Sequence, residues 1–468
     1  MSVILKEIYD ETADIALLSS FYSGLYIAGF PDANERESLA NMKRYLELKR
    51  EGWYELNNYH IILALDGDRT VAASVSDYLA KPNCGVIEFL LVDQLVRGTG
   101  LGKLVHDATL KAFHADASAA GQNAVDGVVI ELNDPFRVAP QDDNYDPFAR
   151  ALIWDRWGYG RLCFPYVQPA LSDDQEPVTC RLLGMKPIAP ALQHGVPSAT
   201  ICDVLEGYLR WAMRIEQPEL DPTFTAMKQY LSGQATVQLE PLSVYVGRDP
   251  KRPLSIKPVT RSTDPNFSVA TDVYSRAFPA GPTVIDVRMF ANALRWSVGR
   301  SDVHYHFWAL AAGPTEPVTG MASFFVTQNF VFGGYLALER PLRGTGRARV
   351  ILRRVEEQAI RDERGAHVHY IECLPNSPEE AIFAHLGFEP VPVQYVQPPM
   401  LDDEHFGSGA GPQITLLRKP LGCNYGKVAF SASDFLSDLK VWLAEVYRIS
   451  EPEASQTFKI ASATVDRP

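Results

Sequence analysis

Val96-Arg97-Gly98-Thr99-Gly100-Leu101-Gly102 and, far downstream, Leu342-Arg343-Gly344-Thr345-Gly346-Arg347-Ala348 are nearly the same glycine-rich turn, present twice. Each turn follows an apolar, strand-like run, Val86 to Val92 or Gly334 to Leu338, and precedes a stretch with the pattern of a helix. A strand that leads through such a turn into a helix leaves the first N–H groups of the helix without partners, and these groups bind phosphate oxygens. The arginine of each copy adds a fixed positive charge. A turn with an incidental arginine is the alternative for one copy, and the second copy argues against it.

The duplication extends over most of the chain. Tyr59-His60 matches Tyr305-His306 at an offset of 246 residues, the same offset that relates the two glycine-rich turns. Further matches follow at smaller offsets: Ile130-Glu131 with Ile371-Glu372, Tyr166-Val167-Gln168-Pro169 with Tyr395-Val396-Gln397-Pro398, and Arg214-Ile215 with Arg448-Ile449. The chain is therefore predicted to consist of two copies of one unit, each long enough to bury its own core.

The matched landmarks also give the predicted boundaries. Residues 1–240 form the first unit and residues 241–468 the second, with a polar, proline-marked linker from Gly247 to Pro253. The falling offset means that the first unit carries extra residues, most of them in an irregular loop around Arg137 to Tyr145. The sequence predicts an α/β (α+β) fold, in which each unit has a mixed, mostly antiparallel sheet flanked by helices. The predicted strands and helices of the first unit are His60–Leu65, Val71–Ser76, Val86–Val92 and Val128–Leu132, and Glu35–Lys49, Gly102–Ala115 and Val204–Ile215; those of the second are Tyr305–Leu310, Val318–Thr327, Val331–Leu338 and His369–Cys373, and Phe435–Ile449.

Composition excludes several classes of function. The formal net charge of −13 opposes a nucleic-acid partner, because phosphate backbones are held by clustered Lys and Arg. The first twenty residues are too charged for a signal peptide, and no apolar run is long enough to cross a membrane. The histidines show no metal-site spacing, and the cysteines, which form no CxxC pair, are Cys84, Cys163, Cys180, Cys202, Cys373 and Cys423. We expect a cytoplasmic protein with reduced thiols and no metal.

The two turns and their surroundings resemble the GNAT superfamily of N-acetyltransferases. In that family an arginine or glutamine is followed by two residues, glycine, one residue, and glycine or alanine, as in both copies here. A later helix ends in Gly-Phe or Gly-Tyr, as at Gly158-Tyr159 and Gly387-Phe388. The resemblance implies that each turn is a cradle for the pyrophosphate of acetyl-CoA or another acyl-CoA, with the pantetheine between two splayed strands. The cofactor-binding residues expected on this basis are Leu91, Val92, Arg97, Gly98, Thr99, Gly100, Leu101, Gly102, Leu338, Arg343, Gly344, Thr345, Gly346, Arg347, Ala348 and Asn376.

Glu88 is the candidate general base. An alkyl amine near pKa ~10 is mostly protonated at neutral pH, so a carboxylate that accepts its proton assists its attack on a thioester. Glu88 lies on the strand before the first cradle, on the side-chain parity of Leu90 and Val92, where the family often has its base. The alternative is a structural glutamate. The second unit has Gly334 at the matching position, and the backbone N–H of Val92 is the expected oxyanion donor.

The general acid cannot be assigned in the same way. The family commonly has a tyrosine four residues before the Gly-Phe glycine, and this chain has Trp154 and Phe383 there. Tyr166 is the candidate substitute in the first unit, with core packing as the alternative. Glu131, on the strand expected to splay from the cofactor strand, either holds a cationic substrate or satisfies structural donors.

These observations predict an acyl-CoA-dependent N-acyltransferase, with acetyl as the expected acyl group. Transfer would occur by direct attack in a ternary complex, the acceptor being an amine of a small molecule or peptide. The first unit is expected to be catalytic and the second at least partly degenerate. A non-catalytic CoA-binding sensor or scaffold is the alternative, and O-acyl transfer or decarboxylation on a related fold is a third possibility. The sequence leaves the acceptor and the oligomeric state open.

Overall fold

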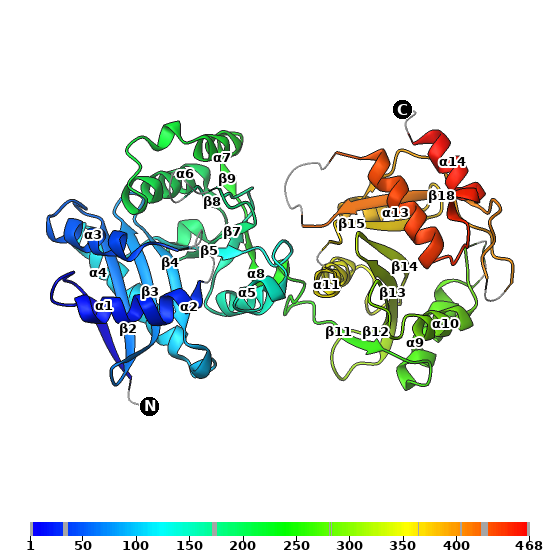
Figure 1. Ribbon diagram of the computed structural model, residues 1–468, viewed down its shortest axis with the longest axis horizontal. Coiled ribbons are helices and arrows are strands. Elements are labelled where there is room, and N and C mark those ends of the chain that lie inside the picture. The colour runs from blue at the N-terminus through cyan, green and yellow to red at the C-terminus, as the bar shows by residue number, and fades with distance from the viewer. Residues whose placement is uncertain are drawn as a thin grey trace. The chain divides into compact units, whose positions relative to one another are not determined.

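The structure, a computed structural model, describes residues 3–30, 36–170, 176–279, 281, 283–363, 365–402, 405–422 and 429–465. The chain divides into two compact units, Met1–Leu242 and Ser243–Pro468 (Figure 1). Pro31, Asp32, Glu35 and Cys423 lie outside the described residues.

The first unit contains a mixed sheet in the order β1-β2-β3-β4-β5-β7-β6-β10. Among the described strands of this sheet, the pairing of β4 with β5 is the only parallel one, which confirms the predicted mixed, mostly antiparallel sheet. The strands are β1 (Val3–Ile8), β2 (Asn58–Asp66), β3 (Arg69–Leu79), β4 (Cys84–Val92), β5 (Gly127–Asn133), β6 (Gly160–Leu162), β7 (Arg181–Pro187) and β10 (Leu239–Pro241), with β8 (Val196–Pro197) and β9 (Thr236–Val237) forming a separate pair.

Helices cover both faces of this sheet. One face packs against α4, which crosses β2, β3 and β4, and the other packs against α1 and α3. The helices are α1 (Ile15–Phe21), α2 (Ile27–Gly29), α3 (Leu39–Arg50), α4 (Leu101–Ala119), α5 (Pro147–Arg156), α6 (Ser198–Gly207) and α7 (Pro222–Ser232), and the short α8 (Leu242–Tyr245) spans the boundary between the two units in the sequence. Local chemistry fixes several ends: Ser38 caps α3 by accepting from the N–H of Asn41, and Asp146 caps α5, which begins with Pro147.

The second unit repeats this plan. Its sheet has the order β11-β12-β13-β14-β15-β18-β16, with β17 paired to β18, and again only one pairing, β14 with β15, is parallel. The strands are β11 (Ser255–Val259), β12 (Val303–Ala311), β13 (Val318–Thr327), β14 (Phe330–Leu338), β15 (Val368–Cys373), β16 (Glu389–Pro390), β17 (Tyr395–Val396) and β18 (Gln413–Pro420). The helices are α9 (Pro265–Ala277), α10 (Val287–Trp296), α11 (Arg347–Asp362), α12 (Pro378–His385), α13 (Ala432–Glu445) and α14 (Gln456–Thr464).

Both sheets have a bulge in the strand that leads to the glycine-rich turn. In β4, Ile87 pairs with Ser76 and Phe89 with Val75, so Glu88 is an extra residue without a partner on β3. The corresponding extra residue of β14 is Gly334. In both units the parallel ladder ends next to the bulge, after Ile87 in β4 and after Gly333 in β14, so the two parallel strands separate there.

The segment from Gly247 to Pro253, predicted to be a linker, is not a free connection between the units. This segment packs on α11 of its own unit, because Arg248 donates to Glu357 at 2.7 Å and Asp249 is almost fully buried. Its polar side chains pair with α11, which a pattern of polarity and prolines alone does not reveal.

Candidate functional site

A cavity of about 980 Å³ opens between β4 and β5 of the first unit, where the two strands separate. It runs from the glycine-rich turn, past the bulge, to the wall formed by α2 and the residues before it. The predicted residues on its lining are Glu88, Leu91, Val92, Arg97, Gly98, Gly100, Leu101, Gly102 and Glu131. One cavity therefore joins the cradle to the candidate base.

The first cradle has the backbone that its glycines require. Gly98 and Gly100 have φ of 83° and 89°, a region that residues with side chains rarely adopt. No described atom lies within 4 Å of where a Cβ on either residue would be, so the space before the turn is open. A Cβ on Gly102 would lie 3.2 Å from Val92, so this glycine lets α4 begin close to β4. Thr99 stabilises the turn by donating to the carbonyl of Val96.

This geometry fits the diphosphate of a CoA ester. Gly100 is the N-cap of α4, and within the described part of the chain no side chain caps the first N–H groups of this helix. Such groups at the start of a long helix bind phosphate oxygens. The guanidinium of Arg97 lies beside the turn, where it donates to the carbonyl of Asn144 at 3.2 Å and stacks on the ring of Tyr145.

The loop that only the first unit carries borders this site. Asn144 accepts from Arg97 through its carbonyl and donates through its side chain to the carbonyl of Gly29, at the end of α2. Asp143 holds the loop in place by accepting two hydrogen bonds from Arg150, at 2.7 and 2.6 Å. The loop thus bridges the cradle and the opposite wall of the cavity.

Glu88 forms a carboxyl pair with Asp77 of β3. Their side chains share a hydrogen bond, and Asp77 is almost fully buried while Glu88 reaches the cavity. Burial raises the pKa of Asp77 to about 7, and burial together with the charge of Asp77 raises the pKa of Glu88 well above its usual range. The pair therefore shares one proton near neutral pH, with Glu88 as its donor.

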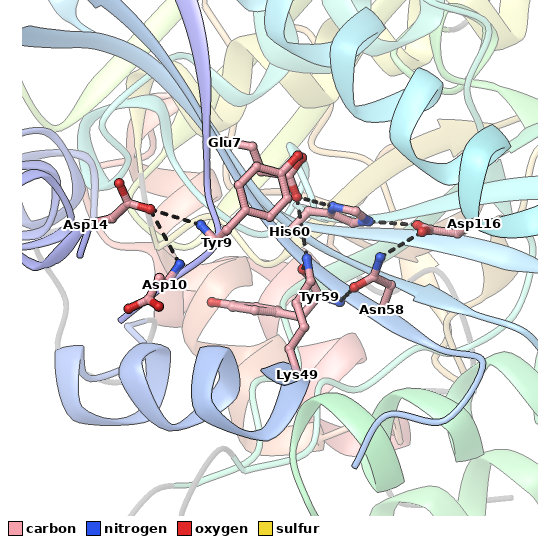
Figure 2. A network of polar contacts seen from close by, with 9 residues as sticks. All are labelled: Glu7, Tyr9, Asp10, Asp14, Lys49, Asn58, Tyr59, His60 and Asp116. Atoms are coloured by element: carbon pink, nitrogen blue, oxygen red, sulfur yellow. Dashed lines mark hydrogen bonds and ion pairs between the residues drawn. The ribbon is translucent and has the colours of Figure 1, made fainter. Parts of the chain in front are cut away.

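A second polar network, centred on His60, supplies positive charge that acts on Asp77. Figure 2 shows His60 between two carboxylates, with its Nδ1 2.6 Å from Glu7 and its Nε2 2.7 Å from Asp116. Burial lowers the pKa of His60, but these two hydrogen bonds outweigh it and raise the pKa above its usual value. Lys49 donates to Glu7 at 3.5 Å. The charges of His60 and Lys49 both favour the ionised form of Asp77.

Tyr166 does not occupy the position predicted for a general acid. Its hydroxyl donates to Glu131, its ring lies in the core, and it is absent from the described lining of the cavity. The contact recurs in the second unit, where Tyr395 donates to Glu372 at 2.5 Å. In each unit this tyrosine thus positions a glutamate, Glu131 of β5 or Glu372 of β15.

Val92 is also not where the sheet departs from regular pairing. Val92 pairs with Ala72 in register, and the irregularity lies at Glu88. The ladder with β5 ends at Ile87. The open backbone groups of β4 therefore begin at the bulge, next to the candidate base.

The second unit has a smaller cavity, of about 440 Å³, and a covered cradle. A Cβ on Gly346 would lie 3.2 Å from the guanidinium of Arg252, and Arg347 donates to the carbonyl of Pro253 at 3.1 Å. The cavity reaches Gly334 and Glu372, but its described lining includes none of the predicted residues Leu338, Arg343, Gly344, Thr345, Gly346, Arg347 and Ala348. Asn376 borders a separate shallow hollow beside α12. The described cavity of this unit thus does not extend to the turn, and the side chain of Arg252, from the segment before β11, lies beside Gly346.

The partner of the base and several polar cavity residues could not be found from the sequence. Examples are Asp77, Gln168, Arg181 and Tyr208, which come from elements distant in sequence and which only the tertiary fold brings near Glu88 and Glu131. The duplication contained one usable signal, because Asp77 matches Ser323 at the offset that relates Glu88 to Gly334. Both carboxyls of the pair are therefore replaced together in the second unit.

The described residues contain no cluster of three His, Cys, Asp or Glu side chains that could hold a metal ion. No helix in the described part of the chain is long and apolar enough to cross a membrane.

Comparison with known proteins gives structural but no sequence relatives. No family model and no curated protein matches the sequence. A tandem GNAT protein from the clavulanic acid biosynthesis pathway is 13% identical, covers 91% of this chain and 100% of its own, and has a TM-score of 0.28. A GNAT-family acetyltransferase from Bacteroides thetaiotaomicron is 15% identical, covers 42% of this chain and 99% of its own, and has a TM-score of 0.32. The ribosomal-protein-S18-alanine N-acetyltransferase of Escherichia coli is 12% identical, with 41% and 97% coverage and a TM-score of 0.27.

The topology of the two sheets establishes the fold independently of these scores. In each unit four antiparallel strands lead through a bulge to a glycine-rich turn and a long helix, and a parallel fifth strand separates from the fourth. The chain is a tandem of two units with the GNAT acetyltransferase fold.

Proposed function

We propose that the first unit is an acyl-CoA-dependent N-acyltransferase, with acetyl-CoA as the expected donor. The observation that carries the proposal is the single cavity that joins the open cradle at Gly98 and Gly100 to Glu88. A bound acyl-CoA would supply a thioester whose carbonyl carbon is attacked by the acceptor amine, with release of the CoA thiol. Small-molecule or peptide amines are the acceptors considered.

The residues of the chain would bind the donor and move one proton. Arg97 and the first N–H groups of α4 would hold the diphosphate. Once it has lost the shared proton, Glu88 would accept the proton of the amine nitrogen, and the negative charge of Asp77 would make that carboxylate more basic. Backbone N–H groups of β4 beyond Ile87, which no longer pair with β5, are available to stabilise a developing oxyanion. The departing thiol needs little assistance, because a thiol of pKa ~8.5 leaves largely as thiolate near neutral pH.

A CoA-binding sensor or scaffold is the second candidate, and Trp154 favours it. This tryptophan occupies the place of the usual acid tyrosine, is almost fully buried, and packs against His106 and Tyr159. No side-chain hydroxyl is therefore available at that position. The sensor would bind CoA esters without turnover.

The two candidates separate in one pair of measurements. Calorimetry with acetyl-CoA tests binding, and a panel of amines with acetyl-CoA, followed by free-thiol release, tests transfer. The enzyme requires both signals, whereas the sensor gives binding without amine-dependent release. Gly100→Asp, which places a side chain and a negative charge in the cradle, is the control that should lose both signals.

A further inference from the structure

The glutamate beside the bulge is held differently in the two units. In the second unit Glu372 accepts from Tyr395 at 2.5 Å, from Tyr447 at 2.8 and 2.9 Å, and from Gln397 at 2.9 Å. Both of its oxygens are thus satisfied by side chains of its own unit. This arrangement leaves Glu372 no hydrogen-bonding task toward a ligand.

In the first unit the corresponding site is incomplete. Tyr166 donates to one oxygen of Glu131, and no described residue donates to the other. Met213 stands where the second unit has Tyr447, so one donor has been lost. Gln168, the counterpart of Gln397, is 5% exposed, and its Oε1 accepts from no described residue.

These unsatisfied acceptors line the same cavity as the catalytic pair. Glu131, Gln168 and Tyr208 border it together with Glu88. An unpartnered buried acceptor such as Oε1 of Gln168 is costly, and together with the second oxygen of Glu131, to which no described residue donates, it calls for a ligand with several donors. A primary ammonium group has three N–H donors and a positive charge, which matches a carboxylate, an amide oxygen and a hydroxyl.

The cavity thus contains two carboxyl subsites on neighbouring strands. Glu88 follows Ile87 and Glu131 follows Ile130, and these two isoleucines are the last paired residues of β4 and β5. Glu37 adds negative charge near Glu88, while the positive charge of Arg181, which lines the same cavity, acts on Glu131. We infer that the acceptor of the first unit is a short aliphatic diamine, with the reacting amine at Glu88 and the second ammonium at Glu131 and Gln168. This inference rests on the proposed function.

Three amines that differ only at the far end of a four-carbon chain test it. Putrescine, n-butylamine and γ-aminobutyrate present an ammonium, a methyl and a carboxylate to the Glu131 subsite. With acetyl-CoA, thiol release should give a kcat/KM for putrescine at least about tenfold above that for butylamine, as expected for one charge-assisted hydrogen bond. γ-Aminobutyrate should be the poorest acceptor. An equal rate for butylamine, or a preference for γ-aminobutyrate, would overturn the assignment.

Matched variants locate the effect. Glu131→Gln can keep its contact with Tyr166 and should lower the ratio of putrescine to butylamine toward one, whereas Glu372→Gln should leave the ratio unchanged. Thermal melting checks that both variants are folded. A ratio that survives Glu131→Gln would refute the second subsite.

A binding assay distinguishes failure of this inference from failure of the proposed function. Calorimetry of the three amines on the CoA-saturated chain should rank putrescine first even if no thiol is ever released. That combined result would refute the acyltransferase and keep the diamine site. Equal or undetectable binding of all three amines, with thiol release for other amines, would refute the diamine site and keep the acyltransferase.

Discussion

Replacement of Glu88 by glutamine tests the base most directly. The amide has the same shape and can still donate to Asp77, so the buried carboxylate keeps its partner and the bulge its geometry. The change removes a proton acceptor from the amine, which is worth roughly 10²- to 10⁴-fold in rate. This corresponds to about 3 to 5 kcal/mol in the activation free energy. Turnover should fall by that factor while calorimetry shows an almost unchanged affinity for CoA.

The pH dependence sharpens the test, because the pair holds one proton near neutral pH. Burial raises the pKa of Asp77 from 3.8 to about 7, so ionising this carboxyl in place costs about 4 kcal/mol more than in water. The remaining proton of the pair is on Glu88, whose pKa is raised well above its usual range, so the kcat/KM of the wild-type chain should rise on the alkaline side of neutral pH as Glu88 ionises. Asp77→Asn removes the neighbouring charge that raises the pKa of Glu88, so the rising limb should move to lower pH.

The assay measures the release of free CoA thiol at a saturating amine concentration between pH 6 and about 9. This range includes the ionisation of the carboxyl pair and that of the released thiol, which has a pKa of ~8.5. Glu88→Gln should lack the limb, and its deficit should shrink as the pH approaches the pKa of the amine. Full activity of this variant at neutral pH, with the wild-type profile, would show that the amine loses its proton elsewhere.

Three further outcomes are expected. Gly100→Asp should abolish CoA binding in calorimetry and Gly346→Asp should change it little, since Arg252 already covers the second cradle; the reverse pattern would move the donor site to the second unit. Arg252→Ala in the Gly100→Asp chain should restore weak CoA binding by uncovering that cradle, and no gain would show that the cradle is closed for another reason. The pKa of His60 is raised in the folded state, so its contribution to stability is fully present below about pH 6.5 and is lost as the pH rises through the raised value. In a plot of melting temperature against pH, His60→Gln should remove the decline above about pH 6.5. An unchanged slope would refute the charged state of the imidazole.

The sequence alone predicted the duplication, the mixed sheets and the two strand–turn–helix junctions. Those predictions rest on short local patterns repeated at nearly constant spacing, and such patterns determine local structure directly. The bulge was not predictable, because an extra residue in β4 is defined only by the register of β3 against it. For the same reason Asp77 was missed as the partner of Glu88.

The covered second cradle shows a different limit. Gly344 and Gly346 have the same left-handed backbone as Gly98 and Gly100, so the local sequence formed the local structure. The access to that turn depends on Arg252, which precedes the first strand of the unit by three residues. Local chemistry specifies a site, and the surrounding chain determines its access.

The two units share the bulge but differ at both positions of the carboxyl pair, so the second unit shows what the sheet does without these two carboxyls. Where the first unit has Asp77 and Glu88, the second has Ser323 and Gly334, and the hydroxyl of Ser323 accepts from the N–H of Tyr335 at 3.1 Å, directly after the bulge. The sheet retains its register, its extra residue and its separated strands without either carboxyl. The bulge and the separation of the strands therefore do not depend on the carboxyl pair, and the extra residue of the second unit is a position without a functional side chain. Reinstating a base there would require both residues, because a Cβ on Gly334 would lie 2.9 Å from the Ser323 hydroxyl.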